Sequence, residues 1–255
     1  MQLRVLGCSG GIGQNLRTST FLLDDDILLD AGTGVGDLTM EEMRNLKHIF
    51  ITHSHMDHIT SIPLLIDTLF SELREPLQVH AQPDTIEAMK THIFNWKIWP
   101  DFAELPTKDS PVLEFLPMHP GDVVQIKDRS ISMIKVEHTV PAVAYAATSN
   151  NRCMVYSGDT STNDSLWQAL NELPSLDLMI IESAFANDDM ELAKIAKHYC
   201  PSLLAEDIKK LKHKPQIAIS HLKPGEESLI MGQCRSLMGG DWELHQLSSG
   251  DVFQI

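Results

Sequence analysis

Four side chains that commonly bind metal ions fall within six residues: His53, His55, Asp57 and His58. They follow 47–52, an apolar run that we expect to be a buried strand, and they precede a helical pattern. Histidines two residues apart project to the same side of an extended segment, so His53 and His55 can bind one cation. Asp57 and His58 lie where the chain turns into the helix, within reach of a second cation. These ligand types suit zinc, and also iron or manganese.

Three further candidate ligands, His138, Asp159 and His221, each lie close behind a predicted strand. A lone His or Asp in such a position is usually a polar loop residue. Open sites, however, form where several strands deliver side chains to one edge of a sheet. We therefore expect these three residues to complete a site for two metal ions, which the histidine cluster alone cannot fill.

The rest of the chain must supply the elements that hold these residues. Strands are expected over 2–6, 18–24, 26–30, 47–52, 77–80, 112–116, 122–126, 130–136, 143–149, 152–156, 177–182, 216–220, 243–247 and 251–254, and helices over 59–73, 84–95, 163–172 and 201–212. Helices in both halves, with runs of strands between them, predict the α+β class. The expected architecture is two mixed β-sheets face to face with helices outside, in a single domain over 1–255.

Composition limits the kinds of partner. The 255 residues carry a formal net charge of −15, which argues against a large nucleic-acid interface because such a chain repels polyanions. The longest apolar runs are far shorter than a membrane span, and the N-terminus looks like a strand and not like a signal segment. The four cysteines show no tight pairing and no metal-type spacing. We expect a cytoplasmic protein with reduced thiols and no membrane partner.

The order of these motifs resembles the metallo-β-lactamase superfamily. The motifs are His-x-His-x-Asp-His from residue 53, then His138, Ser157-Gly158-Asp159-Thr160 and Ser220-His221. The resemblance implies an αβ/βα sandwich. It implies one metal ion on His53, His55 and His138, a second on Asp57, His58 and His221, and Asp159 as the bridge between them. It also implies that Asp30 supports ligand histidines through hydrogen bonds, although a simple turn aspartate stays an alternative.

Other segments are similar to the class II 3′,5′-cyclic-nucleotide phosphodiesterases of that superfamily. The similarity covers most of the chain in the family's order, at 53–63, 83–90, 92–102, 138–139, 181–187 and 220–224. Within 92–102, Asn95 and Trp96 are candidate substrate contacts, since aromatic side chains can stack on a base. Packing of a helix end into the core is the equal alternative. Met56 stands where leucine is frequent, and the chain is shorter than many members, so a preference for cyclic AMP or cyclic GMP does not follow.

The site suggests a mechanism for hydrolysing a cyclic nucleotide to a nucleoside 5′-monophosphate. A hydroxide bridging two divalent cations, with zinc as the expected metal, would attack phosphorus in line. Asp57 and Asp159 are the expected catalytic carboxylates. Glu182 is a candidate for orienting a histidine or donating a proton. Thr139 is a candidate contact for the phosphate, Lys223 could offset the phosphate charge, and structural roles for these three stay open.

Three other functions stay open as alternatives. A ribonuclease Z-like nuclease shares the fold and much of the ligand pattern, but the acidic charge and the lack of a basic, glycine-rich arm argue against it. A thiolester or lactone hydrolase would leave 83–102 unexplained. A non-catalytic cyclic-nucleotide sensor fits poorly with a complete ligand set. The expected partner is a small cyclic nucleotide, and a homodimer is compatible with the sequence.

Overall fold

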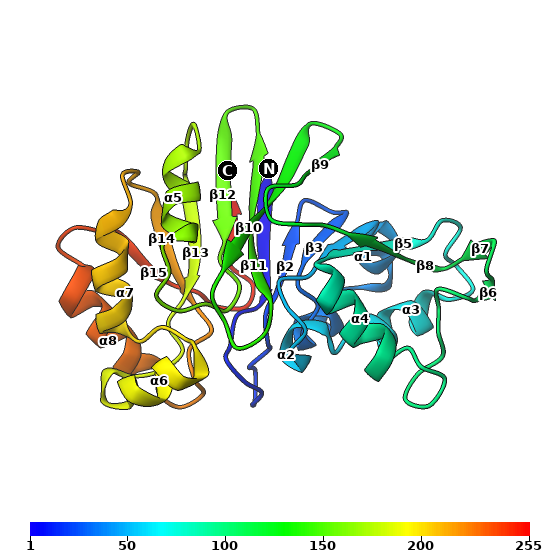
Figure 1. Cartoon of the computed structure of the whole chain (residues 1–255), viewed down its shortest axis with the longest axis horizontal. Helices are drawn as coiled ribbons and strands as arrows, with labels where there is room; N and C mark the ends of the chain where they lie inside the picture. The colour runs from blue at the N-terminus through cyan, green and yellow to red at the C-terminus, as the bar shows by residue number, and fades with distance from the viewer.

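The computed structural model describes all 255 residues and contains two seven-stranded β-sheets that pack face to face (Figure 1). The strands of the first sheet, in order across it, are β16 (Val252–Gln254), β1 (Gln2–Gly7), β2 (Thr20–Leu23), β3 (Ile27–Leu29), β4 (His48–Phe50), β5 (Leu77–Ala81) and β8 (Leu113–Pro117). Strands β3, β4, β5 and β8 are parallel, and the other neighbours pair antiparallel. The first sheet is therefore mixed, as predicted.

The second sheet comes from the C-terminal half of the chain and is also mixed. Its strands, in order, are β15 (Leu244–Gln246), β14 (Gln216–Ser220), β13 (Leu178–Glu182), β12 (Arg152–Tyr156), β11 (Ala142–Ser149), β10 (Arg129–Val136) and β9 (Val123–Ile126). Strands β12 to β15 are parallel, whereas β9 to β12 pair antiparallel. A separate two-stranded hairpin joins β6 (Pro106–Thr107) to β7 (Ser110–Pro111).

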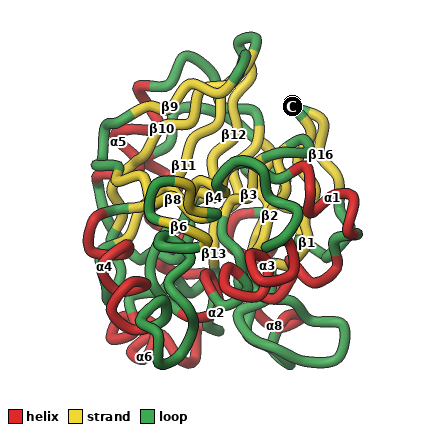
Figure 2. The backbone as a smooth tube through the Cα atoms, turned by 90° about the vertical axis from the view of Figure 1, so that its right-hand side faces the viewer, coloured by secondary structure: helices red, strands yellow, loops and turns green.

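Helices cover the outer faces of both sheets. Those of the first half are α1 (Met40–Asn45), α2 (Met56–Ile59), α3 (Ile62–Leu69) and α4 (Pro83–His92), and those of the second are α5 (Ser165–Glu172), α6 (Met190–Ala196), α7 (Pro201–Asp207) and α8 (Glu227–Met238). In Figure 1, α1, α3 and α4 flank the sheets on the right, and α5, α7 and α8 flank them on the left. Helices α2 and α6 lie at the lower end in both Figure 1 and Figure 2. This is the αβ/βα sandwich that the sequence predicted.

Alternation along the strands divides the core into layers. Ile27 and Leu29 of β3 pack between the two sheets, whereas Leu28 between them packs against the helices of the first half. In β12, Tyr156 faces the other sheet and Val155 faces the helices of the second half. Successive strand residues point to opposite faces, so a strand buried on both sides must be apolar throughout. The continuous apolar runs in the sequence reflect this double burial.

The helix predicted over 59–73 is two helices. Helix α2 ends at Ile59, and α3 begins at Ile62 with Pro63 in its first turn. Proline lacks a backbone N–H and its ring clashes with the carbonyl four residues earlier, so Pro63 cannot continue a helix through Ile59 but suits a helix start. The break lets α2 take its own direction beside the histidine cluster.

Three helices were not predicted from the sequence: α1, α6 and α8. Helix α8 buries Ile230, Met231, Cys234 and Met238, a helical spacing with polar residues between. Helix α1 begins with a capping box in which Thr39 and Glu42 bond each other's backbone. Both signals are present in the sequence. Helix α6 ends at Lys197, which adopts a left-handed backbone with φ 52°.

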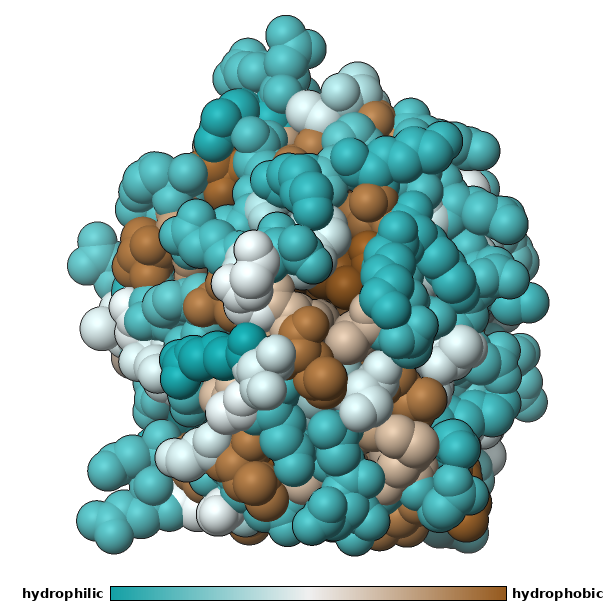
Figure 3. Space-filling view, turned by 90° about the vertical axis from the view of Figure 1, so that its left-hand side faces the viewer, coloured by the Kyte–Doolittle hydropathy of each residue, from teal (hydrophilic) through white to brown (hydrophobic).

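The surface over the second half of the chain is mostly hydrophilic. Figure 3 shows this face, on which separate hydrophobic areas interrupt the polar surface. Helices α6 and α8 contribute exposed apolar side chains, including Leu192, Ile195 and Leu229. No helix combines the length and the apolar character that crossing a lipid bilayer would need.

A buried histidine in the first sheet, His80, predicts a pH effect on stability. His80 is 3% exposed, stacks on Phe50, and places Nε2 at 3.1 Å from Nδ1 of His48. Burial, with a smaller contribution from His48, lowers the pKa of His80 from 6.5 to about 4. The unfolded chain therefore binds a proton here more readily than the folded chain. The contribution to stability is complete above pH 6.5 and is lost as the pH falls toward 4.

We expect the free energy of unfolding to fall by up to roughly 3 kcal/mol across this window because of His80 alone. His80→Phe keeps a stacking ring but removes the titrating group. Urea unfolding at pH 7, 6 and 5 should therefore show a shallower decline in the variant than in the wild type. Equal slopes for both proteins would contradict the assignment, since the other histidines titrate in both.

Candidate metal centre

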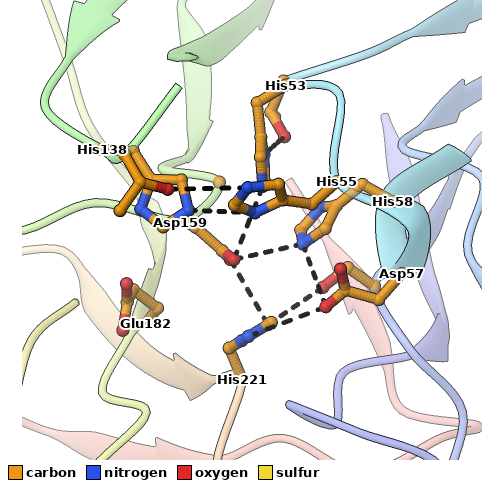
Figure 4. A network of polar contacts seen from close by, with 12 residues as sticks. His53, His55, Asp57, His58, His138, Asp159, Glu182 and His221 are labelled. Atoms are coloured by element: carbon orange, nitrogen blue, oxygen red, sulfur yellow. Dashed lines mark hydrogen bonds and ion pairs between the residues drawn. The ribbon is translucent and has the colours of Figure 1, made fainter. Parts of the chain in front are cut away.

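Five of the seven predicted ligands come from loops that follow four strands, and Asp57 and His58 lie in α2. His53 and His55 follow β4, His138 follows β10, and Asp159 and His221 follow β12 and β14. Figure 4 shows these side chains converging from both sheets, with the Asp159 carboxylate in the centre. The edge where strands of both sheets end is therefore the place where all seven predicted ligands meet.

The ligand atoms form two adjacent groups. His53, His55, His138 and Asp159 make the first group, and Asp57, His58, Asp159 and His221 make the second. Within each group the ligand atoms lie within 4.8 Å of one another. Asp159 belongs to both: its Oδ2 lies 3.7 Å from His53 Nε2 in the first group and 3.3 Å from His58 Nε2 in the second, and its Oδ1 lies 3.3 Å from His221 Nδ1. The geometry suits a carboxylate shared by two cations.

The chemistry of the buried atoms fits metal ions at these groups. Nε2 of His53 and Nε2 of His58 are buried and have no hydrogen-bond partner. A buried polar atom without a partner is costly, and a cation would use each nitrogen lone pair. Burial opposes the charge on Asp159, but His221 and His58 hold the pKa of its carboxyl well below the ordinary value. The carboxylate is therefore ionised, as a ligand must be.

His53 and His58 differ in their protonation. Burial and the neighbouring His58 lower the pKa of His53 well below its ordinary value, so this imidazole is neutral. Burial also opposes a charge on His58, but Asp159 and Asp30 raise its pKa well above the ordinary value. A cation in the second group would displace the His58 proton, so metal binding there releases protons.

Asp30 connects the two ligand groups through hydrogen bonds, made directly to His58 and through Thr52 to His53, on the side of each histidine that does not face the metal site. Its Oδ2 accepts hydrogen bonds from His58 Nδ1 at 2.6 Å, from Thr52 Oγ1 at 2.8 Å and from the Tyr156 hydroxyl at 2.8 Å. Thr52 Oγ1 in turn lies 3.0 Å from His53 Nδ1. One fully buried carboxylate thus orients a histidine of each group, directly or through Thr52. Asp30 occupies the left-handed region with φ 55°, which aspartate tolerates better than most residues.

We expect Asp30→Ala to weaken metal binding by roughly 10- to 100-fold, because His58 and Thr52 lose their common acceptor. Titration against a competing chelator measures this loss, and circular dichroism checks that the variant is folded. Tyr156→Phe keeps the carboxylate and both histidine contacts, so its effect should be smaller. An unchanged affinity in the alanine variant would rule out the orienting role.

Two glycines and one strained residue keep the loops close together. A Cβ on Gly10 would lie 2.6 Å from the carbonyl oxygen of His221, and one on Gly158 would lie 2.8 Å from Cβ of Thr52. His221 itself has φ 60°, held by a hydrogen bond from its N–H to the Cys8 carbonyl at 2.7 Å. Strained backbone of this kind persists where surrounding contacts impose it, and it concentrates at functional sites.

A histidine that was left unassigned from the sequence lies beside these groups. Nδ1 of His198 is 2.7 Å from Glu182 Oε1, and its ring stacks on His221 with centroids 5.3 Å apart. Asp159, Glu182 and His198 form a third close group. Burial opposes a charge on His198, but Glu182 raises its pKa to about 9. No spacing in the sequence links His198 to the metal motif, because it follows the unpredicted α6. In the sequence, the position of Glu182 at the end of a predicted strand was the single indication of this group.

Glu182 is fixed by several donors. Its carboxylate accepts hydrogen bonds from the backbone N–H groups of Thr160 at 2.9 Å and Ala184 at 3.0 Å, in addition to its contact with His198. It is 1% exposed. The structure therefore places Glu182 where it orients His198, and orienting a histidine was one of the three roles considered from the sequence.

A family model agrees with this arrangement of fold and site. The beta-lactamase superfamily domain matches residues 26–228, which is most of the chain and contains every predicted ligand. The chain belongs to the beta-lactamase superfamily. The matched residues include both groups of His and Asp side chains that Figure 4 shows.

Curated relatives in the superfamily have two kinds of name. A probable 3′,5′-cyclic-nucleotide phosphodiesterase of Yersinia pestis is 27% identical over 210 residues, covering 71% of this chain and 58% of the relative. A ribonuclease Z of Methanosarcina mazei is 31% identical over 130 residues, covering 49% of this chain and 40% of the relative. The chain thus spans about half the length of these relatives.

Solved structures support the superfamily fold. The metallo-beta-lactamase fold protein YhfI of Bacillus subtilis aligns with a TM-score of 0.80 at 21% identity, over 99% of both chains. Unliganded yeast PDE1 aligns with a TM-score of 0.83 at 16% identity, also over 99% of both chains. At these identities the likeness concerns the fold alone, and it confirms the predicted metallo-β-lactamase architecture.

The other predicted site residues divide into two sets. Thr139 Oγ1 lies 3.5 Å from His55 Nε2. Lys223 Nζ lies 3.5 Å from the Gly10 carbonyl oxygen and has no carboxylate partner. Both residues therefore border the metal-ligand groups. Asn95 instead accepts hydrogen bonds from the backbone of Lys97 and Ile98 in the turn that ends α4.

Neither Asn95 nor Trp96 makes a hydrogen bond to any of the seven predicted ligands. The turn formed by Asn95, Lys97 and Ile98 is also the reason that the helix predicted over 84–95 stops at His92. Trp96 has φ 62° and is 58% exposed.

Proposed function

We propose that this protein hydrolyses 3′,5′-cyclic nucleotides to nucleoside 5′-monophosphates. The observation that carries the proposal is the pair of adjacent ligand groups sharing Asp159, open beside Thr139 and Lys223. A cyclic phosphodiester is small, carries one negative charge and has non-bridging oxygens to place against two cations. The similarity to the Yersinia relative supports the same substrate class.

Divalent cations in these groups, which we propose to be zinc, would supply a nucleophile from water at neutral pH and neutralise charge on the phosphoryl oxygens. The chain's own residues then have distinct tasks. Asp159 holds both groups at one spacing, and Asp57 completes the second group on its more exposed side. Lys223 offers a cation to the phosphate, because no carboxylate of the chain neutralises it.

His198 is placed to protonate the leaving 3′ oxygen. Glu182 holds its Nδ1, so Nε2 is the nitrogen free to carry a proton toward the reacting group. The dyad lies against His221 and Asp159, close to where a phosphate on both metal groups would sit. Glu182 thereby acts through His198 and does not itself contact the substrate.

A ribonuclease Z-like activity is the second candidate, because the Methanosarcina mazei relative carries that name. The net charge of −15 opposes it, since a transfer-RNA precursor is a polyanion whose binding needs a basic surface. The two activities share the metal chemistry and differ in the size and charge of the substrate.

The decisive experiment offers purified protein of known metal content three substrates: cyclic AMP, cyclic GMP and a transfer-RNA precursor. We expect 5′-monophosphate from a cyclic nucleotide and no cleavage of the precursor. Metal-loaded protein that leaves both cyclic nucleotides intact would end the proposal. Cleavage of the precursor in that case would establish the nuclease.

A further inference from the structure

A second feature of the site is a pocket beside the first metal group that the metal ligands do not fill. It has a volume of about 360 Å³, and its lining includes Gln82, His138, Thr139, Val140, Pro141 and Ala142. Pockets that bind small molecules usually have about 300–1,000 Å³. His138 belongs both to this pocket and to the first metal group, so a ligand in the pocket would touch the reaction site.

Backbone pairing explains why the pocket lies there. The Ile51 N–H donates to the His80 carbonyl at 2.9 Å, which continues the pairing of β4 with β5 up to the end of both strands. Gln82 therefore leaves the first sheet beside Thr52, the residue before His53. The Thr52 carbonyl accepts from the Val143 N–H at 3.0 Å, which brings the start of β11 against the same place. Gln82, which follows β5, thus lines the pocket together with 135–142, the end of β10 and the start of β11.

Gln82 has hydrogen-bonding capacity that the fold leaves unused. Its side-chain oxygen Oε1 is buried and has no donor. Gln82 is also the residue that caps α4, but its side chain makes no capping hydrogen bond. A buried acceptor without a donor costs stability, so the Gln82 amide would gain a hydrogen bond by turning toward a donor in the pocket.

The rest of the lining narrows the chemistry of that ligand. Val140, Pro141 and Ala142 make an apolar wall. Glu137 also lines the pocket but is paired with Lys197, and Lys135 is exposed. An apolar wall with one amide suits a flat heteroaromatic ring that carries N–H groups at its edge.

We propose that this pocket binds the purine base of the cyclic nucleotide and that Gln82 selects adenine. A glutamine amide can accept from the exocyclic N6 amino group of adenine and donate to N7 at the same time. The corresponding edge of guanine presents two acceptors, which leaves Oε1 without a donor. The proposal rests on the proposed function, and it adds a preference for cyclic AMP over cyclic GMP.

The test compares three substrates in Gln82→Met, which keeps the side-chain length and removes both hydrogen-bonding groups. The substrates are cyclic AMP, the cyclic monophosphate of purine riboside, which lacks the 6-amino group, and bis(p-nitrophenyl) phosphate, which has no base. We expect kcat/KM for cyclic AMP to fall roughly ten- to a hundredfold. The analogue should already be poor with the wild type and should lose little more in the variant, and bis(p-nitrophenyl) phosphate should be unaffected.

Gln78→Met is the matched control, because Gln78 lies four residues earlier, within β5, and its amide already donates to Glu114 at 3.1 Å. It should leave all three rates unchanged. An equal loss for cyclic AMP and the analogue would overturn the role of Gln82 in base selection. An equal loss for bis(p-nitrophenyl) phosphate would make Gln82 a support of the metal groups instead. Hydrolysis of bis(p-nitrophenyl) phosphate without any hydrolysis of cyclic AMP or cyclic GMP would overturn the proposed function, and this inference with it. Hydrolysis of cyclic GMP at a rate equal to or above that of cyclic AMP would overturn this inference alone.

Discussion

Asp159→Ala should abolish turnover of the cyclic nucleotide, with a loss of roughly 10³-fold or more, and should lower the metal content from two ions per chain to one or fewer. The reason is that one carboxylate serves both ligand groups, with Oδ2 at 3.7 Å from His53 Nε2 of the first group and at 3.3 Å from His58 Nε2 of the second. Its removal also takes away the largest of the interactions that raise the pKa of His58. Metal analysis of the purified variant and a product assay for 5′-AMP measure the two losses.

The control for this substitution is Asp164→Ala. Asp164 is exposed and pairs with Lys210 on the surface, 2.8 Å away, so its loss should leave metal content and activity unchanged. Thermal unfolding of the two metal-free variants separates ligand loss from misfolding. Two metal ions retained in Asp159→Ala, at wild-type affinity, would show that the groups do not share this carboxylate.

His198→Ala should lower kcat by roughly 10²- to 10⁴-fold while both metal ions stay bound. The side chain is held by Glu182 at 2.7 Å and stacks on His221, but it is not needed to complete either of the first two ligand groups. A proton donor to the leaving oxygen matters in the transition state more than in substrate binding, so KM should change little. Steady-state kinetics with metal analysis checks both statements.

A leaving group that needs no proton provides the sharper readout. Bis(p-nitrophenyl) phosphate releases p-nitrophenolate, which departs as an anion, so the variant should lose much less activity on this substrate than on cyclic AMP. His245→Ala is the matched control, because His245 also pairs with a carboxylate, Asp251, at 2.8 Å, and has no contact with the metal groups. Equal losses on the two phosphodiesters would reject His198 as the proton donor and favour a role in holding His221.

Most of the strands and helices could be predicted from local sequence patterns. Period-two and continuous apolar runs indicated strands such as β3 and β12, because a strand between two layers must bury both faces. Helices were not predicted where the apolar pattern was short or mixed with polar residues, as in α6 and α8. The break between α2 and α3 followed from Pro63, whose effect on the preceding turn outweighed the helical spacing around it.

The sequence by itself determined the candidate ligands. His53, His55, Asp57 and His58 are close along the chain, so their spacing alone predicts a shared cation. The more distant His138 and Asp159 were found because strands tend to deliver functional side chains at their ends.

Only the tertiary structure decided which further residues join the site. Asp30 contacts Tyr156 across 126 positions of the chain, and His198 comes from a loop that no motif marks. In the sequence Gln82 is an ordinary polar residue, and only the structure shows that it lines a pocket where the two sheets end. These roles arise from packing between segments that are far apart in the sequence. No local spacing encodes them, since the hydrogen bonds form only after the two sheets have come together.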